Sequence, residues 1–194
     1  MIKKAHTESA SLIRVMDLII SIIAVTLLTP LLFLLFTILL TESAKPIFRQ
    51  KRLGRNFVPF AMYKFRTMRL CTIQTSTHLV GSEAITPLGY WLRRYKLDEL
   101  PQLINVIMGS MSLVGPRPNL RAQTEVIAAR AALDLYKHKP GLTGLAQIAG
   151  VTMREPRKLA KLDSLMMKKL SVTAYLNILL STVFMQCSRG KSVD

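Results

Sequence analysis

The longest apolar stretch of the chain lies near its beginning. Leu18 to Leu40 is a run of 23 residues without a charged side chain. As a straight helix this run would be about 34 Å long, which is enough to cross a bilayer. Basic residues flank both of its ends, and the positive-inside rule places each flank on the cytoplasmic side. They are Lys3, Lys4 and Arg14 before the run, and Lys45, Arg49, Lys51, Arg52 and Arg55 after it.

A proline interrupts the apolar pattern. Pro30 removes one backbone hydrogen bond and clashes with the carbonyl of Thr26, while the hydroxyls of Thr26 and Thr29 can bond nearby carbonyls. A sharp bend at Thr29 and Pro30 would let both basic flanks stay on one side of the membrane. Residues 1–44 are therefore predicted as a re-entrant helix-break-helix anchor. An ordinary transmembrane helix with a mild proline kink remains the alternative.

Two aromatic and basic runs follow, and their pattern is that of strands. Ile47 to Leu53 and Phe57 to Met68 are separated by Gly54-Arg55-Asn56, which predicts an antiparallel hairpin, with Pro59 at an edge or a bulge. Alternation places Lys64 and Arg66 on one face. These two are the better candidates for reaching a substrate phosphate, whereas the other cations suit a solvated face or anionic lipid.

A helical stripe follows the hairpin. Leu100, Leu103, Ile104 and Ile107 have the spacing of one helix face, Pro101 is tolerated in a first turn, and Gly109 suits the end of the helix. This pattern predicts a helix that begins near Asp98. Residues 70–86, with several Ser and Thr, are predicted as a surface loop.

The remaining pattern completes a helix-rich α+β fold. Leu120 to Lys137 and Leu159 to Leu170 are helical in pattern, and Tyr175 to Met185 is apolar but too short to span a membrane. Residues 45–194 are therefore predicted as one small cytosolic domain with a short antiparallel β element.

The net charge of the chain limits the kinds of partner that we expect it to bind. The 194 residues include 27 Lys or Arg against 11 Asp or Glu, a formal net charge of +16. This excess implies an anionic partner, which could be nucleic acid, anionic lipid or a phosphorylated substrate. The sequence contains no recognisable nucleic-acid-binding module. Cys71 and Cys187 have no ligand spacing and suit a reducing compartment.

Two of the scarce acids are adjacent. Asp98 and Glu99 directly follow Arg93, Arg94 and Lys96. One interpretation is an N-cap aspartate with a glutamate that compensates the helix dipole. The other is a carboxylate nucleophile with a neighbouring acid that binds metal or moves protons.

Two later loops contain further candidates. Arg117 stands between Pro116 and Pro118, so that a stiff loop would present its guanidinium to a phosphate, although a plain turn has the same pattern. The glycines from Gly141 to Gln147 allow close backbone approach, and their N–H groups could form a nest for an oxyanion.

Together these stretches resemble the bacterial sugar transferase family, the monotopic polyisoprenyl-phosphate phosphoglycosyl transferases. The resemblance runs from about Arg14 to Val183, with six motifs in family order. They are Leu-Thr-Pro-Leu at 28–31, Pro-Ile-Phe-Arg-Gln at 46–50, Tyr-Lys-Phe-Arg-Thr-Met at 63–68, Leu-Asp-Glu-Leu-Pro-Gln at 97–102, Met-Ser-Leu-Val-Gly-Pro-Arg-Pro at 111–118 and Lys-Pro-Gly-Leu-Thr-Gly-Leu-Ala-Gln at 139–147.

The resemblance implies transfer of a sugar-1-phosphate from a UDP-sugar to a membrane polyprenyl phosphate, with UMP released, at the cytoplasmic face of the bacterial inner membrane. Asp98 would carry a covalent phospho-sugar, Glu99 would help it hold Mg²⁺, and Thr29-Pro30 would match the family's membrane break. The predicted substrate-binding residues are Lys64, Arg66, Arg94, Arg117, Gly141, Thr143 and Gln147.

A rival hypothesis is a non-catalytic basic membrane adaptor that binds anionic lipid or nucleic acid through its +16 charge. A third is a family member that has lost activity. We expect no nucleic-acid partner, and a homo-oligomer stays open.

Overall fold

A computed structural model describes the backbone of residues 2–69 and 84–191, and the side chains of residues 11–69 and 84–185. The predicted loop at 70–86 lies almost wholly outside these residues. The described helices are α1 (Ile2–Glu42), α2 (Pro87–Arg94), α3 (Gln102–Ile107), α4 (Thr124–Ala131), α5 (Leu145–Ile148), α6 (Pro156–Lys168) and α7 (Val172–Lys191), with 3-10 turns η1 (Arg55–Phe57), η4 (Leu97–Glu99) and η5 (Leu135–Lys137). The strands are β1 (Ile47–Leu53), β2 (Pro59–Phe65), β3 (Ser112–Val114) and β4 (Gly141–Thr143).

The predicted helix-rich α+β class is confirmed, since the described elements are mainly helices with two small two-stranded sheets. The predicted hairpin is also confirmed. β1 and β2 pair antiparallel from Ile47 opposite Phe65 to Leu53 opposite Pro59. Asn56 takes a left-handed φ of 54° in the turn between them, a conformation that asparagine tolerates better than most residues. Pro59, which cannot donate to the ladder, opens the second strand.

A second sheet was not predicted. β3 and β4 pair in parallel and bring Gly115 against Gly141. A Cβ atom on Gly141 would overlap the Gly115 backbone, so this approach requires glycine. Gly115 N–H donates to the Thr143 carbonyl, and Gly141 N–H donates to the Pro116 carbonyl, both over 2.9 Å. The pairing holds the Arg117 loop beside residues 139–143, and it leaves these two N–H groups unavailable for an oxyanion.

The first half of α1 is tied to the rest of the molecule by polar contacts. Arg14 Nη1 donates to the Val106 carbonyl over 2.7 Å, and its Nη2 donates to the Ile107 carbonyl over 2.9 Å. The buried Asp17 carboxylate accepts from the Leu113 N–H over 2.9 Å and from the Tyr175 hydroxyl over 2.7 Å. These bonds fasten α1 to α3, β3 and α7.

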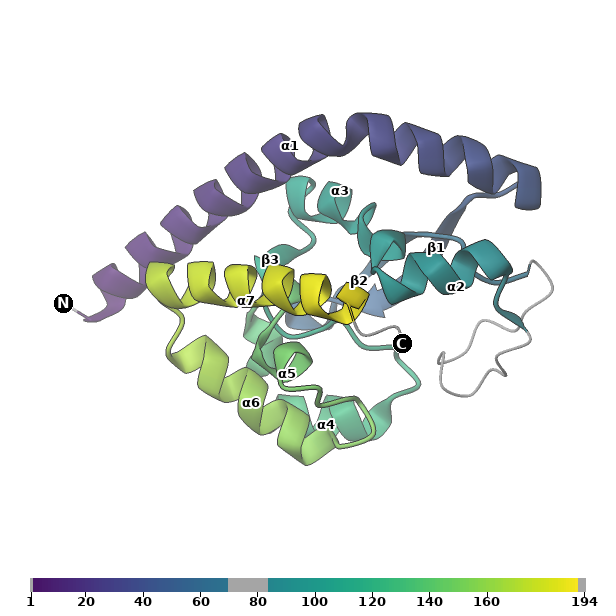
Figure 1. Cartoon of the computed structure of the whole chain (residues 1–194). Coiled ribbons are helices and arrows are strands. Elements are labelled where there is room, and N and C mark those ends of the chain that lie inside the picture. Colours follow the sequence, from purple (N-terminus) through teal and green to yellow (C-terminus); the bar gives the residue numbers. More distant parts are fainter. Residues whose placement is uncertain (1, 70–83, 192–194) are drawn as a thin grey trace.

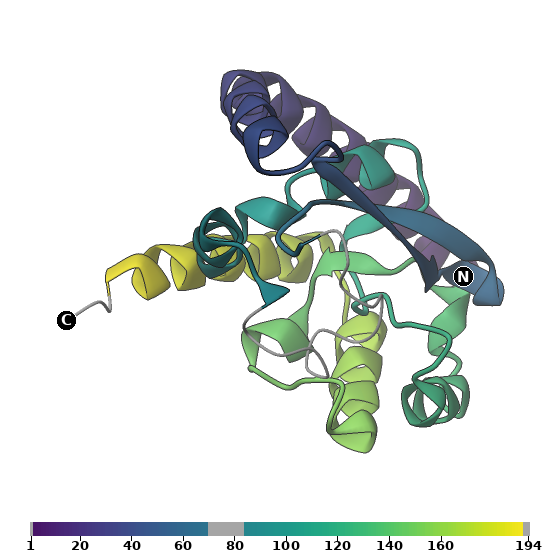
Figure 2. The same cartoon turned by 90° about the vertical axis from the view of Figure 1, so that its right-hand side faces the viewer.

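The second half of α1 packs through apolar side chains instead. Leu35 and Leu39 form a buried cluster with Phe65 of β2 and Leu92 of α2. Both halves of α1 therefore lie against the same folded body, and the helix follows one side of the molecule away from α4 and α6 (Figures 1 and 2). The predicted division at residue 44 remains a prediction.

The predicted break at Thr29 and Pro30 is a bend within a continuous helix. α1 contains Pro30 and runs from Ile2 to Glu42, bending over the molecule (Figure 1). Pro30 has no N–H for the Thr26 carbonyl, which explains the bend. The hydroxyls of Thr26 and Thr29 donate to the carbonyls four residues earlier, over 2.9 and 2.8 Å.

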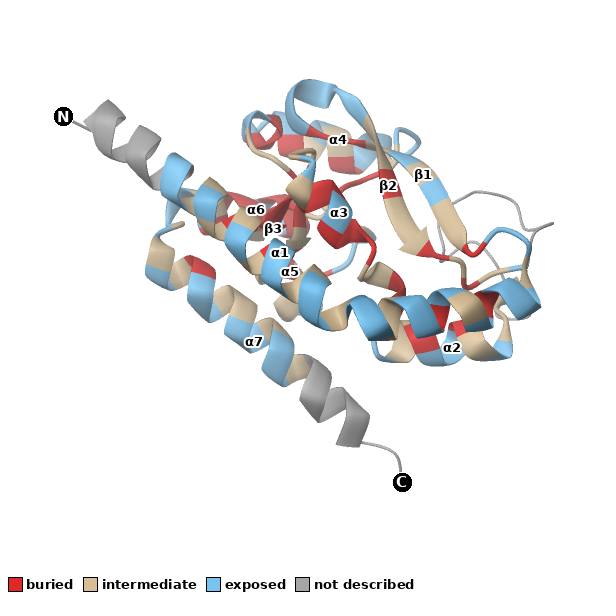
Figure 3. Ribbon diagram, turned by 90° about the horizontal axis from the view of Figure 1, so that it is seen from above, coloured by how far each residue is buried: buried red, intermediate tan, exposed pale blue. Residues whose placement is uncertain are grey.

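Much of α1 remains exposed although it is apolar (Figure 3). Leu27 is 73% exposed and Phe33 is 69% exposed. Among the residues that the structure describes, α1 is the one helix long and apolar enough to cross a membrane. An exposed apolar face of this extent marks an interaction surface rather than a core.

Candidate functional site

The acid pair lies in a 3-10 turn, not at the start of an α-helix. Asp98 and Glu99 belong to η4, and α3 begins only at Gln102. The sequence prediction of the helix start was wrong here because i to i−3 hydrogen bonds continue through Pro101, including Leu103 N–H to the Leu100 carbonyl.

The predicted apolar stripe is also shifted. Leu103 is buried as predicted, but Ile104 is 47% exposed, and Gln102, Asn105 and Val106 occupy the inner face instead. Asn105 explains part of this shift, because its side chain accepts from one backbone group of β2 and donates to another, over 3.0 and 2.7 Å. These bonds fix η4 and α3 beside β2, which carries Lys64.

Glu99 is paired on one oxygen with two cations. Its Oε1 accepts from Lys64 Nζ over 2.8 Å and from Arg117 Nη2 over 2.6 Å. Burial alone would raise the pKa of Glu99, but Arg117 and Lys64 outweigh burial and hold this pKa far below its usual range. Glu99 is therefore ionised at every physiological pH.

Asp98 is in a different state. It is only 7% exposed, and its Oδ2 lies 4.0 Å from Lys64 Nζ. Burial raises the pKa of Asp98 to about 6, against the opposing effects of Lys64, Arg93 and Arg117, and the charge of Glu99 adds to the rise. A carboxylate with little solvation and no close ion pair is more reactive than one that is fully paired.

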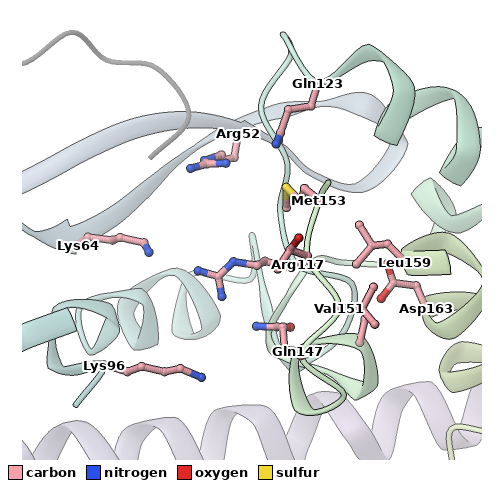
Figure 4. A pocket seen from close by; sticks show the side chains of 13 residues that line it. Arg52, Lys64, Lys96, Arg117, Gln123, Gln147, Val151, Met153, Leu159 and Asp163 are labelled. Carbon is pink, nitrogen blue, oxygen red and sulfur yellow. The ribbon is translucent and has the colours of Figure 1, made fainter. Parts of the chain in front are cut away.

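A cavity of about 370 Å³ is lined by Lys64 and Arg117, the two cations that pair with Glu99. Four cationic side chains line part of it, those of Arg52, Lys64, Lys96 and Arg117, and Figure 4 shows Lys64 and Lys96 directed toward the guanidinium of Arg117, which points back toward them. The other wall is less polar. It includes Ala146, Val151, Met153 and Leu159, with the amides of Gln123 and Gln147 nearby.

The structure brings several of the predicted site residues together. Lys64, Asp98, Glu99 and Arg117 form one cluster, and Gln147 lines the same cavity. Gln147 Nε2 donates to the Leu142 carbonyl over 2.9 Å. As predicted from its two flanking prolines, the Arg117 side chain extends from its loop, and it is 37% exposed.

Other predicted residues lie elsewhere. Arg66 Nε donates to the Lys45 carbonyl over 2.7 Å, and its guanidinium lies over the Phe48 ring. Arg94 lies over the Trp91 ring, 5.6 Å from its centroid.

Two further predicted residues have packing contacts. The hydroxyl of Thr143 is 2.7 Å from that of Thr182 on α7, and Gly141 lines a second, small cavity described below. The role predicted for Thr143 stays a prediction, whereas the Gly141 N–H is already bonded to the Pro116 carbonyl.

Sequence reasoning missed a buried polar network behind Arg117. Arg130 of α4 donates twice to Asp163 Oδ2 of α6, over 2.7 and 3.0 Å. Its Nη1 also donates to the Arg117 carbonyl over 2.7 Å. Asn119 joins this network by accepting from Arg130 and from the Tyr136 hydroxyl. The scarcity of acids that singled out Asp98 and Glu99 could also have singled out Asp163.

The acid pair has a donor set that Mg²⁺ accepts. Within the described parts of the chain there is no group of three or more His, Cys, Asp or Glu side chains that could hold a metal ion. Mg²⁺ does not need such a group, because it commonly binds one or two carboxylates and completes its octahedron with water and substrate phosphates. Asp98 and the second oxygen of Glu99 fit that pattern.

Comparison with known proteins gives consistent matches. A family model described as bacterial sugar transferase matches residues 8–189. An exopolysaccharide production protein PSS from Rhizobium leguminosarum bv. phaseoli is 36% identical over 200 residues, covering 92% of this chain and 96% of that protein.

Two larger relatives have names that specify reactions. A UDP-glucose:undecaprenyl-phosphate glucose-1-phosphate transferase from Klebsiella pneumoniae is 36% identical over 184 residues, or 88% of this chain and 39% of that protein. A UDP-N-acetylgalactosamine-undecaprenyl-phosphate N-acetylgalactosaminephosphotransferase from Aeromonas hydrophila is 35% identical over 140 residues, or 70% of this chain and 33% of that protein. The chain thus spans well under half the length of these two relatives.

Proposed function

Because this chain belongs to the bacterial sugar transferase family, we propose that it transfers a sugar-1-phosphate from a UDP-sugar to a membrane polyprenyl phosphate, such as undecaprenyl phosphate, and releases UMP. The product would begin the assembly of a bacterial surface glycan. The observation that carries the proposal is a buried, weakly paired carboxylate, Asp98, whose nearest cation, Lys64, lines a cavity together with three other cationic side chains.

In the first step, an Asp98 carboxylate oxygen attacks the sugar-linked phosphorus of the donor. The bond between this phosphorus and the bridging oxygen breaks, and UMP leaves with that oxygen and its electron pair. Lys64 and Arg117 are placed to offset the charge of the diphosphate, which would otherwise repel a carboxylate nucleophile. The outcome is a phospho-sugar bound covalently to Asp98.

In the second step, a phosphate oxygen of the polyprenyl phosphate attacks the same phosphorus. The bond to Asp98 breaks, the carboxylate is regenerated, and the lipid carries a diphosphate linked to the sugar. Neither step needs an added oxidant or reductant. Since each step releases an anion, the cations around Glu99 serve both halves of the reaction.

Asp98 and Glu99 are the residues that would hold Mg²⁺. A bound magnesium ion supplies positive charge close to the phosphate oxygens. Lys64 and Arg117 supply the rest from the protein, and both are held by Glu99.

The lipid acceptor requires a site at a membrane surface. We infer that α1 enters the cytoplasmic leaflet as a bent, re-entrant helix and does not cross the bilayer. Support comes from the contacts of both halves of α1 with one folded body, and from the apolar side chains left exposed between them. Single cysteines at positions 5 and 45, in a protein whose Cys71 and Cys187 are replaced by serine, test this topology. Labelling of both from the cytoplasmic side supports the re-entrant form, and labelling from opposite sides contradicts it.

The activity is tested with the purified full chain, Mg²⁺, undecaprenyl phosphate and a panel of UDP-sugars that includes UDP-glucose and UDP-N-acetylgalactosamine. We expect acceptor-dependent UMP release with at least one donor, and its loss in Asp98→Asn. Unimpaired turnover by Asp98→Asn would remove Asp98 as the nucleophile. A non-catalytic adaptor would instead show lipid affinity that falls steeply with salt and no UMP release.

A further inference from the structure

Arg52 is a half-buried cation that forms no ion pair with any of the described carboxylates. It lies near the end of β1 and lines the cavity beside Lys64 and Arg117. Its Nη2 donates to Gln50 over 2.7 Å, and its Nη1 makes only a long contact of 3.4 Å with the Pro118 carbonyl. Its Nε is buried and has no acceptor, and none of the described carboxylates forms an ion pair with it.

This state is costly for a guanidinium. Burial and, to a smaller extent, the charge of Arg117 lower the pKa of Arg52 to about 10, although the charge of Glu99 acts in the opposite direction. Buried donors nearly always have an acceptor, so an orphaned Nε at a cavity wall requires an explanation. An anion in the cavity would supply both the acceptor and the missing charge.

A second orphaned donor lies close by. Gln102 is 3% exposed, and its Nε2 has no acceptor. Gln102 and Arg52 line one small cavity of about 20 Å³, together with Lys64 and Arg117. A space of this size accommodates one oxygen-sized group, such as a water molecule or one oxygen of a larger ligand.

The charges around the two cavities favour the larger ligand. Four cationic side chains line the main cavity, and the adjacent carboxylates of Asp98 and Glu99 offset two of them. Asp163 also lines it but is already paired with Arg130. None of the ion pairs among the described residues offsets Arg52, so the wall that it shares with Lys64 and Arg117 keeps a positive charge that suits the dianionic diphosphate of a nucleoside diphosphate ester.

We propose that Arg52 and Gln102 bind phosphate oxygens of the nucleoside diphosphate donor, on the side of the cavity next to Lys64 and Arg117. This inference rests on the proposed function. The planar guanidinium of Arg52 can donate to the ligand through Nε and Nη1, and the Gln102 amide donates from the floor of the small cavity. Both residues thus act as binding groups for the donor.

The test compares four variants of the full-length protein in detergent with Mg²⁺. They are Arg52→Met, Arg52→Lys, Gln102→Met and the control Lys51→Met, which removes the same charge from an exposed neighbour on β1. UDP affinity is measured by calorimetry, and KM and kcat are measured for the UDP-sugar that the wild type accepts. The melting temperature is measured without and with UDP.

We expect Arg52→Met to weaken UDP binding and raise KM about 10- to 100-fold, the effect of losing charge-assisted hydrogen bonds, with a smaller change in kcat. Arg52→Lys should fall between this variant and the wild type, because it keeps the charge and loses the planar fork. Gln102→Met should raise KM about 3- to 10-fold. Lys51→Met should match the wild type.

Ligand-free stability separates binding from a structural role. Since the Nε of Arg52 is buried without an acceptor, Arg52→Met should melt no lower than the wild type without UDP and should lose most of the UDP-induced rise. A ligand-free melting temperature well below that of the wild type, with UDP affinity unchanged, would show a structural arginine and overturn the inference. If Gln102→Met binds UDP as tightly as the wild type, Gln102 does not bind the donor, and the small cavity holds water instead. If the wild type neither binds UDP nor releases UMP, the proposed function itself fails.

Discussion

Two acid–arginine pairs involve the Arg117 loop, one through the Arg117 carbonyl and one through its side chain, and they differ in what surrounds them. The pair of Arg130 and Asp163 is shielded from solvent, with side chains only 3% and 2% exposed, and is called the closed pair below. Arg130 also donates to the Arg117 carbonyl and to Asn119, so its donors are well used. In the pair of Arg117 and Glu99, called the open pair below, Arg117 lines the cavity and its side chain is 37% exposed.

The difference indicates that the closed pair fixes the position of the loop that carries the open pair. A buried ion pair adds little net stability over an apolar replacement, but it fixes geometry when its remaining donors bind backbone groups. Arg130 does this by bonding the carbonyl of Arg117 itself. The closed pair positions the loop, and the open pair keeps its cations and carboxylates available to a ligand.

The largest effect is expected from breaking the open pair. Glu99→Gln removes the anion that holds both Lys64 and Arg117, and it removes one of the two carboxylates proposed for Mg²⁺. We expect UMP release to fall about 1,000-fold or more, an effect comparable to removing a principal electrostatic group from an active site. Steady-state assays over a range of Mg²⁺ concentrations measure it. A fall of less than tenfold in UMP release would mean that the charge of Glu99 is not needed for the reaction.

Breaking the closed pair should affect stability first. Asp163→Asn leaves the Arg130 charge buried without its counter-ion, and we expect a loss of about 3 kcal/mol in the free energy of unfolding. The double variant Arg130→Met/Asp163→Leu should regain most of this loss while still impairing UMP release, because the Arg117 carbonyl loses its donor. Denaturant titration and the transfer assay measure the two effects.

The exposed pair of Glu155 and Lys158 on α6 provides a matched control. Its atoms are 3.3 Å apart, and its side chains are at least half exposed. Glu155→Gln should change the free energy of unfolding by less than about 0.5 kcal/mol. Equal losses of unfolding free energy in Glu155→Gln and Asp163→Asn would contradict a stronger effect of the buried ion pair.

The two carboxylates of the acid pair should also titrate differently. Burial raises the pKa of Asp98 to about 6, whereas Glu99 stays ionised. The nucleophile is the deprotonated form of Asp98, so kcat/KM for the UDP-sugar should be level above about pH 7 and fall about tenfold per unit below about pH 6. Intact melting behaviour at each pH is the control. A level profile down to pH 4.5 would argue against a raised pKa for the nucleophile.

A further difference between the two carboxylates concerns the stability of Asp98→Asn. The folded state holds the pKa of Asp98 above its ordinary value of 3.8, so folding favours the protonated form and ionisation destabilises the protein. The penalty grows as pH rises from about 4 to about 6 and is complete above that. Asp98→Asn should therefore raise the free energy of unfolding by up to about 3 kcal/mol at pH 7.5 and by almost nothing at pH 4. A variant that is less stable at pH 7.5 would contradict the destabilising role of the ionised carboxylate.

The local parts of the fold were predictable because their signals are local. Gly54-Arg55-Asn56 between two aromatic and basic runs predicted the hairpin, and the two prolines predicted the stiff loop at Arg117. Asp98 and Glu99 stood out because acids are rare in this chain.

The rest depends on contacts between distant segments. Three-residue strands are too short to show alternation, so the pairing of β3 with β4 had no sequence signal. Arg52 was assigned to the basic flank of the membrane anchor, and only its place in the fold shows an orphaned donor. Pro30 predicted a break, but a long helix packed on both halves can bend and continue.

The proposed reaction requires that Asp98 accept the phospho-sugar group of the donor. The most direct measurement is to incubate the protein with Mg²⁺ and an accepted UDP-sugar without the lipid, quench it, and analyse its peptides by mass spectrometry. We predict a sugar-phosphate adduct on the peptide that carries Asp98, which disappears when polyprenyl phosphate is added before the quench. Continued formation of the lipid product, with no adduct on Asp98 at any time, would contradict the account.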